Sequence, residues 1–147
     1  MRLKSSFVFD RSKPVQAITP KAFHSILVED FGYQSQEHFG IIVLNSSNIM
    51  LGVEVLTIGT VNQTPVDRKI IFQRILQKKK YNTAVGFVAF HNHPSGSFVA
   101  SDEDIDLTRK IAAAAEIMGF RFLDHIIVAW NVTKSIRTLH PEIFTEE

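Results

Sequence analysis

The sequence His91-Asn92-His93-Pro94-Ser95-Gly96 decides the fold, together with the apolar run Ala84-Val85-Gly86-Phe87-Val88-Ala89-Phe90 that leads into it. A short apolar run bounded by turn residues predicts a buried strand, here over residues 84–91. Successive side chains of a strand point to opposite faces, so His91 and His93 would project from one face at the strand end. The proline and glycine that follow predict that the chain leaves the sheet there in a sharp turn.

A helix is expected next, over residues 101–118. Ser101 and Asp104 have the spacing of a capping box, and Gly119 is a typical stop signal. The apolar stripe of this helix consists of Ile105, Thr108, Ala112, Ala115 and Met118. Asp104 would lie in the first turn, able to fold back over the two histidines. Many soluble helices carry a capping box without any catalytic purpose, so this pair also has a purely structural interpretation.

The two histidines and the aspartate are predicted to bind zinc. Zinc takes histidine nitrogen and carboxylate oxygen, and a catalytic zinc keeps three protein ligands plus an open position for water. His91, His93 and Asp104 would supply those ligands. A lone histidine at a strand end is usually structural, but two at this spacing, before a turn and a capped acidic helix, favour a metal site. The pattern points to a hydrolase.

Two further residues are candidates for catalytic work. Hydrolysis requires a base, and Glu54 is the candidate because an ionisable group is out of place in the half-apolar strand predicted over residues 49–57. A glutamate near a strand edge is also often the solvent-facing member of the alternation. Ser101 could donate its hydroxyl to the oxyanion that forms when water attacks a carbonyl.

The order of these residues resembles the JAMM metalloprotease motif of MPN (JAB) domains, and in particular their bacterial RadC-like branch. The motif residues are Glu54, then His91-x-His93, seven residues, and Ser101-x-x-Asp104. Further matches are His-Asn-His-Pro-Ser-Gly at 91–96, Glu54 five residues before Gly59-Thr60, Arg68-x-Ile70 opening a helix, and Leu123-Asp124-His125-Ile126-Ile127 on the final strand. The matches extend from about Phe39 to Val128 in the right order.

This resemblance implies both a fold and an activity. The fold would be α/β (α+β), with a mixed sheet flanked by helices and a relation to the cytidine deaminases. The cofactor would be Zn²⁺ held by His91, His93 and Asp104, with Glu54 as general base and Ser101 supporting the transition state. The reaction would be cleavage of a peptide or isopeptide amide bond in a peptide or protein substrate.

The sequence departs from the RadC-like pattern at positions that touch no proposed ligand. Members usually have His-Pro-Arg where this chain has Val66-Asp67-Arg68, and Pro-Ser where it has Ala100-Ser101. Longer members carry an N-terminal helix-hairpin-helix DNA-binding region, whereas residues 1–38 are too short for one and lack its glycine turns. We therefore expect an arm and a helix over residues 1–38 and a catalytic domain over residues 39–147, standing alone.

Two similar motifs are rejected. In HNH nucleases the three letters denote dispersed residues, and three consecutive strand residues cannot all face one metal. A zinc deaminase requires a later Pro-Cys-x-x-Cys, and this chain has no cysteine. The lack of cysteine also rules out disulfides and thiolate zinc sites, which is consistent with a reducing compartment.

Composition and charge fit one compact, soluble, cytoplasmic domain. The 45% hydrophobic fraction, with twelve phenylalanines, can fill a single core. Neither a signal peptide nor a membrane span is expected, because no long apolar stretch occurs. Sixteen basic against fifteen acidic side chains give almost no net field, which argues against tight binding to nucleic acid. The cluster Lys78-Lys79-Lys80 is interpreted as a solvated helix end.

The remaining elements are predicted from caps and turn signals. Thr19-Pro20 gives a cap and a first-turn proline for a helix. The sequence Asn45-Ser46-Ser47-Asn48 predicts the loop of a hairpin. The expected elements are an irregular or strand-like arm over 1–18, helices over about 20–31 and 65–77, and strands over 39–44, 49–57 and 120–130.

The last strand carries His125 in an apolar setting. It is expected to be a hydrogen-bonded core histidine rather than a fourth ligand, although it could still support the ligands from behind. His24, His38 and His140 show no ligand spacing.

These features together predict a zinc-dependent hydrolase of the RadC-like JAMM type. The competing interpretation is a non-enzymatic binding module in DNA repair, suggested by the family's historical association with repair. A third interpretation is a metal-free scaffold, and the complete set of five site residues argues against it.

Overall fold

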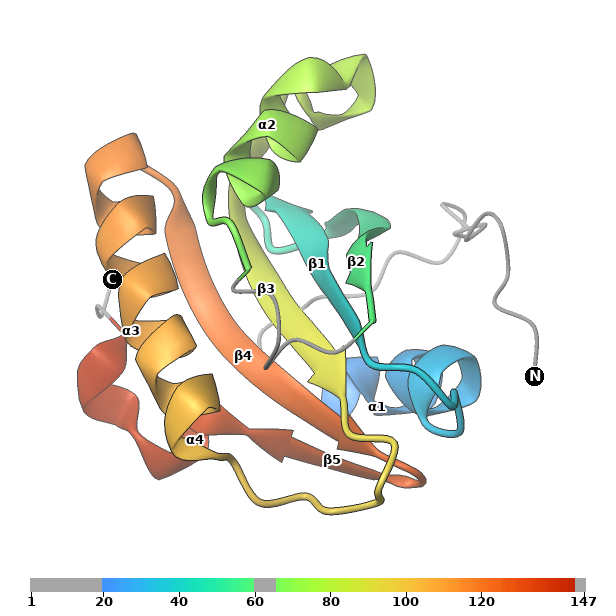
Figure 1. Cartoon of the computed structure of the whole chain (residues 1–147). Helices are drawn as coiled ribbons and strands as arrows, with labels where there is room; N and C mark the ends of the chain where they lie inside the picture. The colour runs from blue at the N-terminus through green and yellow to red at the C-terminus, as the bar shows by residue number, and fades with distance from the viewer. Residues whose placement is uncertain (1–19, 60–65, 145–147) are drawn as a thin grey trace.

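The computed structural model describes residues 20–59 and 66–144. Its elements are α1 (Pro20–Phe31), β1 (His38–Asn45), β2 (Met50–Ile58), α2 (Lys69–Gln77), the 3-10 turn η1 (Lys79–Tyr81), β3 (Ala84–Asn92), α3 (Asp102–Met118), β4 (Arg121–Ala129), β5 (Val132–Ser135), α4 (Ile136–Leu139) and the 3-10 turn η2 (Pro141–Ile143). The strands form one five-stranded sheet in the order β2-β1-β3-β4-β5. Helices cover both of its faces (Figure 1), which confirms the predicted mixed sheet flanked by helices.

The sheet is mixed because β3 and β4 are parallel, whereas the other neighbouring strands are antiparallel. A parallel pair needs a crossover connection, and α3 supplies it. The chain leaves the C-terminal end of β3 through a long loop and enters α3 near that same end of the sheet (Figure 1). The end of β3 and the first turn of α3 therefore face each other.

Both faces of the sheet are buried, which explains the unbroken apolar run in β3. Phe87 and Ala89 pack on the face covered by α2 and α3, whereas Val88 and Phe90 pack against α1. His91 follows Ala89 by two residues and so continues the face covered by α2 and α3. Within the part of the chain that the structure describes, no helix has the length and apolarity needed to cross a membrane.

Most predicted boundaries agree with the structure to within one or two residues. The hairpin of β1 and β2 forms as expected, and α3 lies between its cap Ser101 and Gly119, whose φ is 80°. The helix predicted over 65–77 is shorter, because α2 begins only at Lys69. The side chain of Asp67 accepts a hydrogen bond from the Lys69 N–H at 2.9 Å, and such a bond competes with continuing the helix backwards.

Two parts of the chain have no such agreement to report. The short strand β5 and the elements after it were not predicted, since four residues with polar members give little strand signal. The arm over residues 1–18 and the Thr19 cap lie outside the described residues.

Candidate metal centre

Three side chains converge at the C-terminal end of β3. His91 Nε2 lies 2.9 Å from His93 Nε2 and 3.0 Å from Asp104 Oδ1, and His93 Nε2 lies 3.2 Å from Asp104 Oδ2. His91 and Asp104 are buried, whereas His93 is half-buried. The three predicted metal ligands are therefore brought together, two by the end of β3 and one by the first turn of α3.

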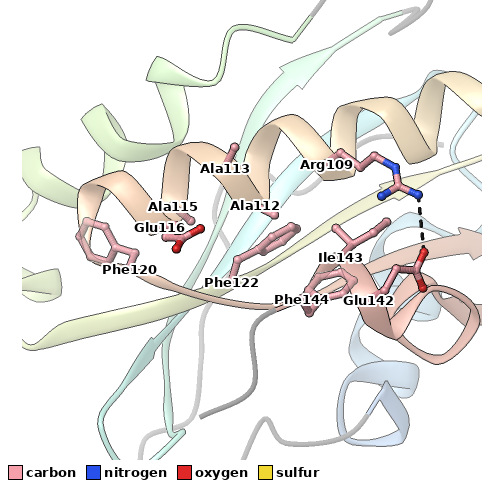
Figure 2. A pocket seen from close by; sticks show the side chains of 10 residues that line it. All are labelled: Arg109, Ala112, Ala113, Ala115, Glu116, Phe120, Phe122, Glu142, Ile143 and Phe144. Atoms are coloured by element: carbon pink, nitrogen blue, oxygen red, sulfur yellow. Dashed lines mark ion pairs between the residues drawn. The ribbon is translucent and has the colours of Figure 1, made fainter.

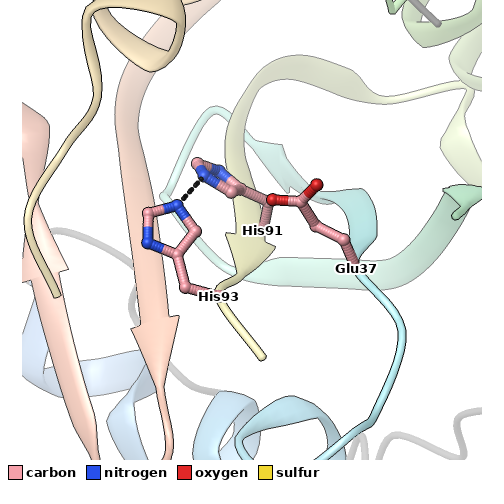
Figure 3. Close-up of side chains that lie close together, drawn as sticks. All are labelled: Glu37, His91 and His93. Carbon is pink, nitrogen blue, oxygen red and sulfur yellow. Dashed lines mark hydrogen bonds between the residues drawn. The ribbon is translucent and has the colours of Figure 1, made fainter. Parts of the chain in front are cut away.

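Glu37 joins the two histidines, and the sequence reasoning missed it. One carboxylate oxygen of Glu37 and one ring nitrogen each of His91 and His93 lie within 4.8 Å of one another, so this group could hold a metal ion. Figure 3 shows the Glu37 carboxylate reaching towards the His91 ring from the segment before β1. Phe39 pairs with His91 in the antiparallel ladder of β1 and β3, so residue 37 lies just past the last residue of β3, beside His93.

Asn92 holds the Glu37 segment in this place. Its side chain lies on the opposite face of β3 from that of His91, because successive side chains of a strand alternate. The Asn92 Oδ1 accepts a hydrogen bond from the His38 N–H at 2.5 Å, and its Nδ2 donates to the Gln36 carbonyl at 3.0 Å. Both neighbours of Glu37 are thus tied to the end of β3. The Glu37 carbonyl also accepts a hydrogen bond from the Gly59 N–H at 2.8 Å.

The turn after His93 is held by Trp130. Gly96 has a φ of 83°, and a Cβ atom added there would lie 2.6 Å from the indole of Trp130, so only glycine fits. The indole N–H donates to the Pro94 carbonyl at 3.3 Å. The predicted sharp turn is confirmed, and the tryptophan fixes the loop that carries His93.

The hydrogen bonds of His93 and Asp104 define the chemistry of the centre. His93 Nδ1 lies 2.7 Å from the Ser97 carbonyl, which can only accept, so Nδ1 carries the hydrogen and the lone pair of a neutral ring is at Nε2. Burial alone would raise the pKa of Asp104, but hydrogen bonds with His91 and His93 lower it far below its usual range. Burial alone would lower the pKa of His93, but its hydrogen bonds to Asp104 and the Ser97 carbonyl raise it. An ionised carboxylate therefore faces imidazole nitrogens and favours a positive charge between them.

A cleft of about 440 Å³ opens over this centre. Ser101 lies on its wall and caps α3: its Oγ accepts a hydrogen bond from the Asp104 N–H at 3.1 Å, and Asp104 Oδ2 accepts one from the Ser101 N–H at 2.9 Å. The predicted capping box is confirmed, and it places Ser101 beside Asp104. The lining residues are Ser35, Gln36, Glu37, Gly59, His93, Pro94, Ser95, Ser97, Val99, Ser101 and Asp104.

Glu54 lies in a different cluster. Its carboxylate accepts hydrogen bonds from Arg74 Nη1 at 3.0 Å, from Lys78 Nζ at 2.9 Å and from the Tyr81 hydroxyl. Lys80 Nζ lies 3.5 Å from the same carboxylate. We call these residues the Glu54 cluster. The lysine run follows the end of α2 as expected, and Lys78 and Lys80 in addition form ion pairs with Glu54 while their side chains stay partly exposed.

The strand order explains this separation. Glu54 pairs with Ile41 on β1, and Ile41 pairs with Ala89 on β3, so β1 lies between the strand of Glu54 and the strand of the two histidines. Two strand spacings place Glu54 roughly 10 Å across the sheet from β3. Burial would raise the pKa of Glu54, but hydrogen bonds from Tyr81, Lys78 and Arg74 lower it to about 2. A carboxylate held in this way takes up a proton poorly at neutral pH, which argues against Glu54 as the general base.

His125 is the predicted core histidine. It is fully buried, its Nε2 lies 2.8 Å from His91 Nδ1, and its Nδ1 lies 2.7 Å from Thr108 Oγ1. Burial, with a smaller contribution from nearby His91, lowers its pKa well below the usual value. His125 therefore contacts His91, a predicted metal ligand, at the ring nitrogen that faces away from His93 and Asp104.

A second cavity, of about 280 Å³, lies between α3, β4 and the C-terminal segment (Figure 2). Alanine and phenylalanine side chains dominate its lining, and Arg109 and Glu142 form an ion pair of 3.5 Å at its rim. It shares no lining residue with the cleft, so the two cavities are separate.

Comparison with known proteins identifies the family of this chain. A family profile described as "RadC-like JAB domain" matches residues 17–140. The chain is 35% identical over 136 residues to a UPF0758 protein of Nostoc sp., covering 92% of this chain and 54% of that protein. Two similar proteins, also called UPF0758 proteins, come from Trichormus variabilis (36% identical, 91% of this chain and 54% of that protein) and Desulforudis audaxviator (35% identical, 81% and 50%). The chain thus spans about half the length of these curated relatives. By the extent of these matches, it belongs to the RadC-like JAB domain family.

Proposed function

We propose that this chain is a zinc-dependent hydrolase of the JAMM type that cleaves a peptide or isopeptide amide bond. The proposal rests above all on one observation: His91 Nε2, His93 Nε2 and the Asp104 carboxylate meet at distances of 2.9 to 3.2 Å beside an open cleft. Membership of the RadC-like JAB family supports the same chemistry. The amide as substrate follows from the resemblance to JAMM metalloproteases.

The residues present fit a zinc ion. Two imidazole nitrogens and one carboxylate oxygen are a usual ligand set of catalytic zinc sites, which keep a further position open. The chain has no thiol that would compete for the ion. When bound, zinc would supply a Lewis acid that polarises a carbonyl group and makes water acidic near neutral pH.

In this proposal Glu37 replaces Glu54 as the proton acceptor. Its carboxylate lies in the same small group as His91 and His93, whereas the carboxylate of Glu54 is held by cations in another part of the sheet. Glu37 would take a proton from the attacking water and deliver it to the leaving amine, the usual double role of a general base. The Asn92 hydrogen bonds to both flanking residues keep it in place.

Ser101 would stabilise the oxyanion. Its Oγ accepts a hydrogen bond from the Asp104 N–H, which leaves the hydroxyl hydrogen able to donate into the cleft. A donor aimed at the developing negative charge contributes several kcal/mol in other hydrolases, on the order of 3 kcal/mol. The same hydroxyl thus serves the helix and the reaction.

The first test is metal content and hydrolysis. Protein purified without added zinc is analysed for metal and then assayed with a pool of internally quenched peptides and with an isopeptide-linked fluorogenic probe. We expect one zinc per chain and turnover that a chelator abolishes and zinc restores. Fully zinc-loaded protein that cleaves neither probe would contradict the amide hydrolase.

The second test compares two glutamates by the same conservative change. Glu37→Gln should keep zinc and lower turnover by roughly 10²- to 10⁴-fold, because the shape stays and the base is lost. Glu54→Gln should keep both zinc and most of the turnover of the folded protein. The reverse result would return the role of base to Glu54 and refute the assignment of Glu37.

A further inference from the structure

We infer that Thr108 and His125 fix the ring hydrogen of His91 at Nδ1 and so keep its Nε2 lone pair directed at the metal position. They would be positioning residues, and the inference rests on the zinc centre proposed above. The observation behind it is a buried chain of three hydrogen bonds behind the centre. The proposed hydrolysis assigns no role to these hydrogen bonds. They include the histidine of the Leu123-Asp124-His125 sequence.

The three hydrogen bonds connect two of the proposed ligands, Asp104 and His91. The Thr108 hydroxyl donates to the Asp104 carbonyl at 2.6 Å, Thr108 Oγ1 lies 2.7 Å from His125 Nδ1, and His125 Nε2 lies 2.8 Å from His91 Nδ1. Thr108 and His125 are 0% exposed and His91 is 1% exposed. Water is therefore kept away from these bonds, and each donor and acceptor must be satisfied within the protein.

The positions of the hydrogens follow from the bond between Thr108 and Asp104. A carbonyl oxygen can only accept, so the single hydroxyl hydrogen of Thr108 points at Asp104. Thr108 Oγ1 must then accept from His125, which places a hydrogen on His125 Nδ1. In a neutral imidazole the other nitrogen carries a lone pair, so His125 Nε2 accepts from His91 Nδ1. When His91 is neutral, its remaining nitrogen, Nε2, then carries the lone pair, and this nitrogen faces His93 and Asp104.

A neutral His125 is what its surroundings require. The ring is fully buried, and its two nitrogens contact a hydroxyl and another imidazole. An imidazolium there would have no carboxylate at hydrogen-bond distance from its nitrogens among the described residues, and an uncompensated buried charge is costly.

Hydrogen bonds that run in the opposite direction through His125 would prevent His91 Nε2 from binding the metal. With its hydrogen on Nε2, His125 would donate to His91 Nδ1, and a neutral His91 would then carry its hydrogen on Nε2, between itself and Asp104. Thr108 would also have to turn its hydroxyl hydrogen towards His125 and leave the Asp104 carbonyl. Partners that orient a ligating histidine in this way are typically worth 10- to 100-fold in metal affinity.

The direct test is the tautomer of His125 in the metal-free protein. Long-range ¹H–¹⁵N NMR spectra of protein labelled with ¹⁵N-histidine distinguish a ring with its hydrogen on Nδ1 from one with its hydrogen on Nε2. We expect the Nδ1–H form of His125, with and without zinc. A His125 found with its hydrogen on Nε2, or a doubly protonated His125, would overturn the inference.

A matched pair of variants tests the role of Thr108. Thr108→Val keeps the shape and removes the hydroxyl, so the Nε2–H form of His125 should become populated and zinc affinity should fall by about 10- to 100-fold. Thr108→Ser keeps the hydroxyl and should keep both the wild-type tautomer and the wild-type affinity. Unfolding curves of both variants report any general loss of stability. A Thr108→Val protein with unchanged tautomer and affinity would refute the role.

These outcomes are separable from those of the hydrolase proposal. If the tautomer and the zinc affinities behave as expected while no probe is cleaved, the proposed reaction fails and the positioning role stands. If the probes are cleaved but His125 carries its hydrogen on Nε2, the positioning role fails and the hydrolase stands.

Discussion

Two buried carboxylates lie on the same face of the sheet, and their neighbours differ completely. Glu54 and Asp104 are each 6% exposed. Glu54 is surrounded by the cations of Arg74, Lys78 and Lys80, whereas Asp104 faces the ring nitrogens of two histidines. The comparison shows that burial of a carboxylate does not by itself mark a site: the charge of its neighbours decides.

The physical difference lies in where the balancing positive charge comes from. In the Glu54 cluster the protein supplies it permanently, because lysine and arginine are charged at neutral pH. At Asp104 the partners are imidazoles, and His93 already donates its Nδ1 hydrogen to the Ser97 carbonyl. A proton or a metal ion must then supply the positive charge. The first arrangement stabilises the fold, and the second is suited to binding an ion from outside.

The largest effect is expected from a change at the metal centre. His93→Ala removes one of three ligands and should abolish stoichiometric zinc, measured by metal analysis after dialysis. Zinc at 100 times its Kd should stabilise the wild type by about 2.7 kcal/mol and leave this variant unchanged. His140→Ala, at an exposed histidine paired with Glu142, is the control and should keep its zinc. Full occupancy in the His93→Ala protein would refute the ligand set.

The next effect concerns the Glu54 cluster and stability rather than metal. Glu54→Gln should lower the free energy of unfolding by about 1 to 3 kcal/mol, because it leaves Arg74, Lys78 and Tyr81 without their charged acceptor. Asp106→Asn removes the carboxylate of an exposed pair with Lys110 and should cost no more than about 1 kcal/mol. Equal, small losses in the two variants would show that the cluster contributes no more than a surface ion pair.

The same cluster predicts a pH dependence. The folded pKa of Glu54 is lowered from 4.5 to about 2, so its stabilisation is complete above pH 4.5 and is lost as the pH falls towards 2. Unfolding measured from pH 5 to pH 2 should therefore show a steeper loss of stability in the wild type than in Glu54→Gln. Parallel curves would contradict the lowered pKa.

The sequence could predict that His91, His93 and Asp104 meet, because they are local. His91 and His93 follow one buried strand, and Asp104 begins the next helix, so strand periodicity and a capping box suffice to bring them together. The mixed sheet, in contrast, was an implication of the resemblance to MPN (JAB) domains. The meeting of the three side chains needed no knowledge of which strands are neighbours.

The place of Glu54 could not be predicted in the same way, because it depends on strand order. Glu54 is a candidate base because it is ionisable in an apolar strand, but β1 lies between its strand and β3. The signal for Glu37 was present in its position directly before β1: once β1 is placed antiparallel to β3, the residue before it lies at the histidine end. The run that contains Lys78 and Lys80 was a second signal, because basic side chains can form ion pairs with a buried glutamate such as Glu54.

A smaller effect is expected at Ser101, which belongs to both the fold and the metal centre. Ser101→Ala removes the cap of α3 and should cost about 1 kcal/mol of stability. It should separately lower turnover, because the donor to the oxyanion is lost. Ser101→Asp keeps a capping acceptor without a hydroxyl, so it should recover stability but not activity. Full activity of Ser101→Asp would leave only the capping role.

The smallest effect is expected on the affinity for duplex DNA, and this affinity again depends on the Glu54 cluster. The chain has a net charge of +1, and in the structure Lys78 and Lys80 are paired with Glu54, which reduces the positive field of the only lysine run. Binding to a generic duplex at physiological salt should therefore be weak, with a Kd on the order of 10⁻⁴ M or weaker. Glu54→Gln frees both lysines and should strengthen this binding slightly, with a steeper dependence on salt, whereas Glu37→Gln should leave it at most marginally changed. The contrary outcome is tight, salt-sensitive binding by the wild type that is lost when Lys78, Lys79 and Lys80 are all changed to glutamine. It would favour the DNA-binding module, because the lysines would then contact the phosphates of nucleic acid rather than the carboxylate of Glu54.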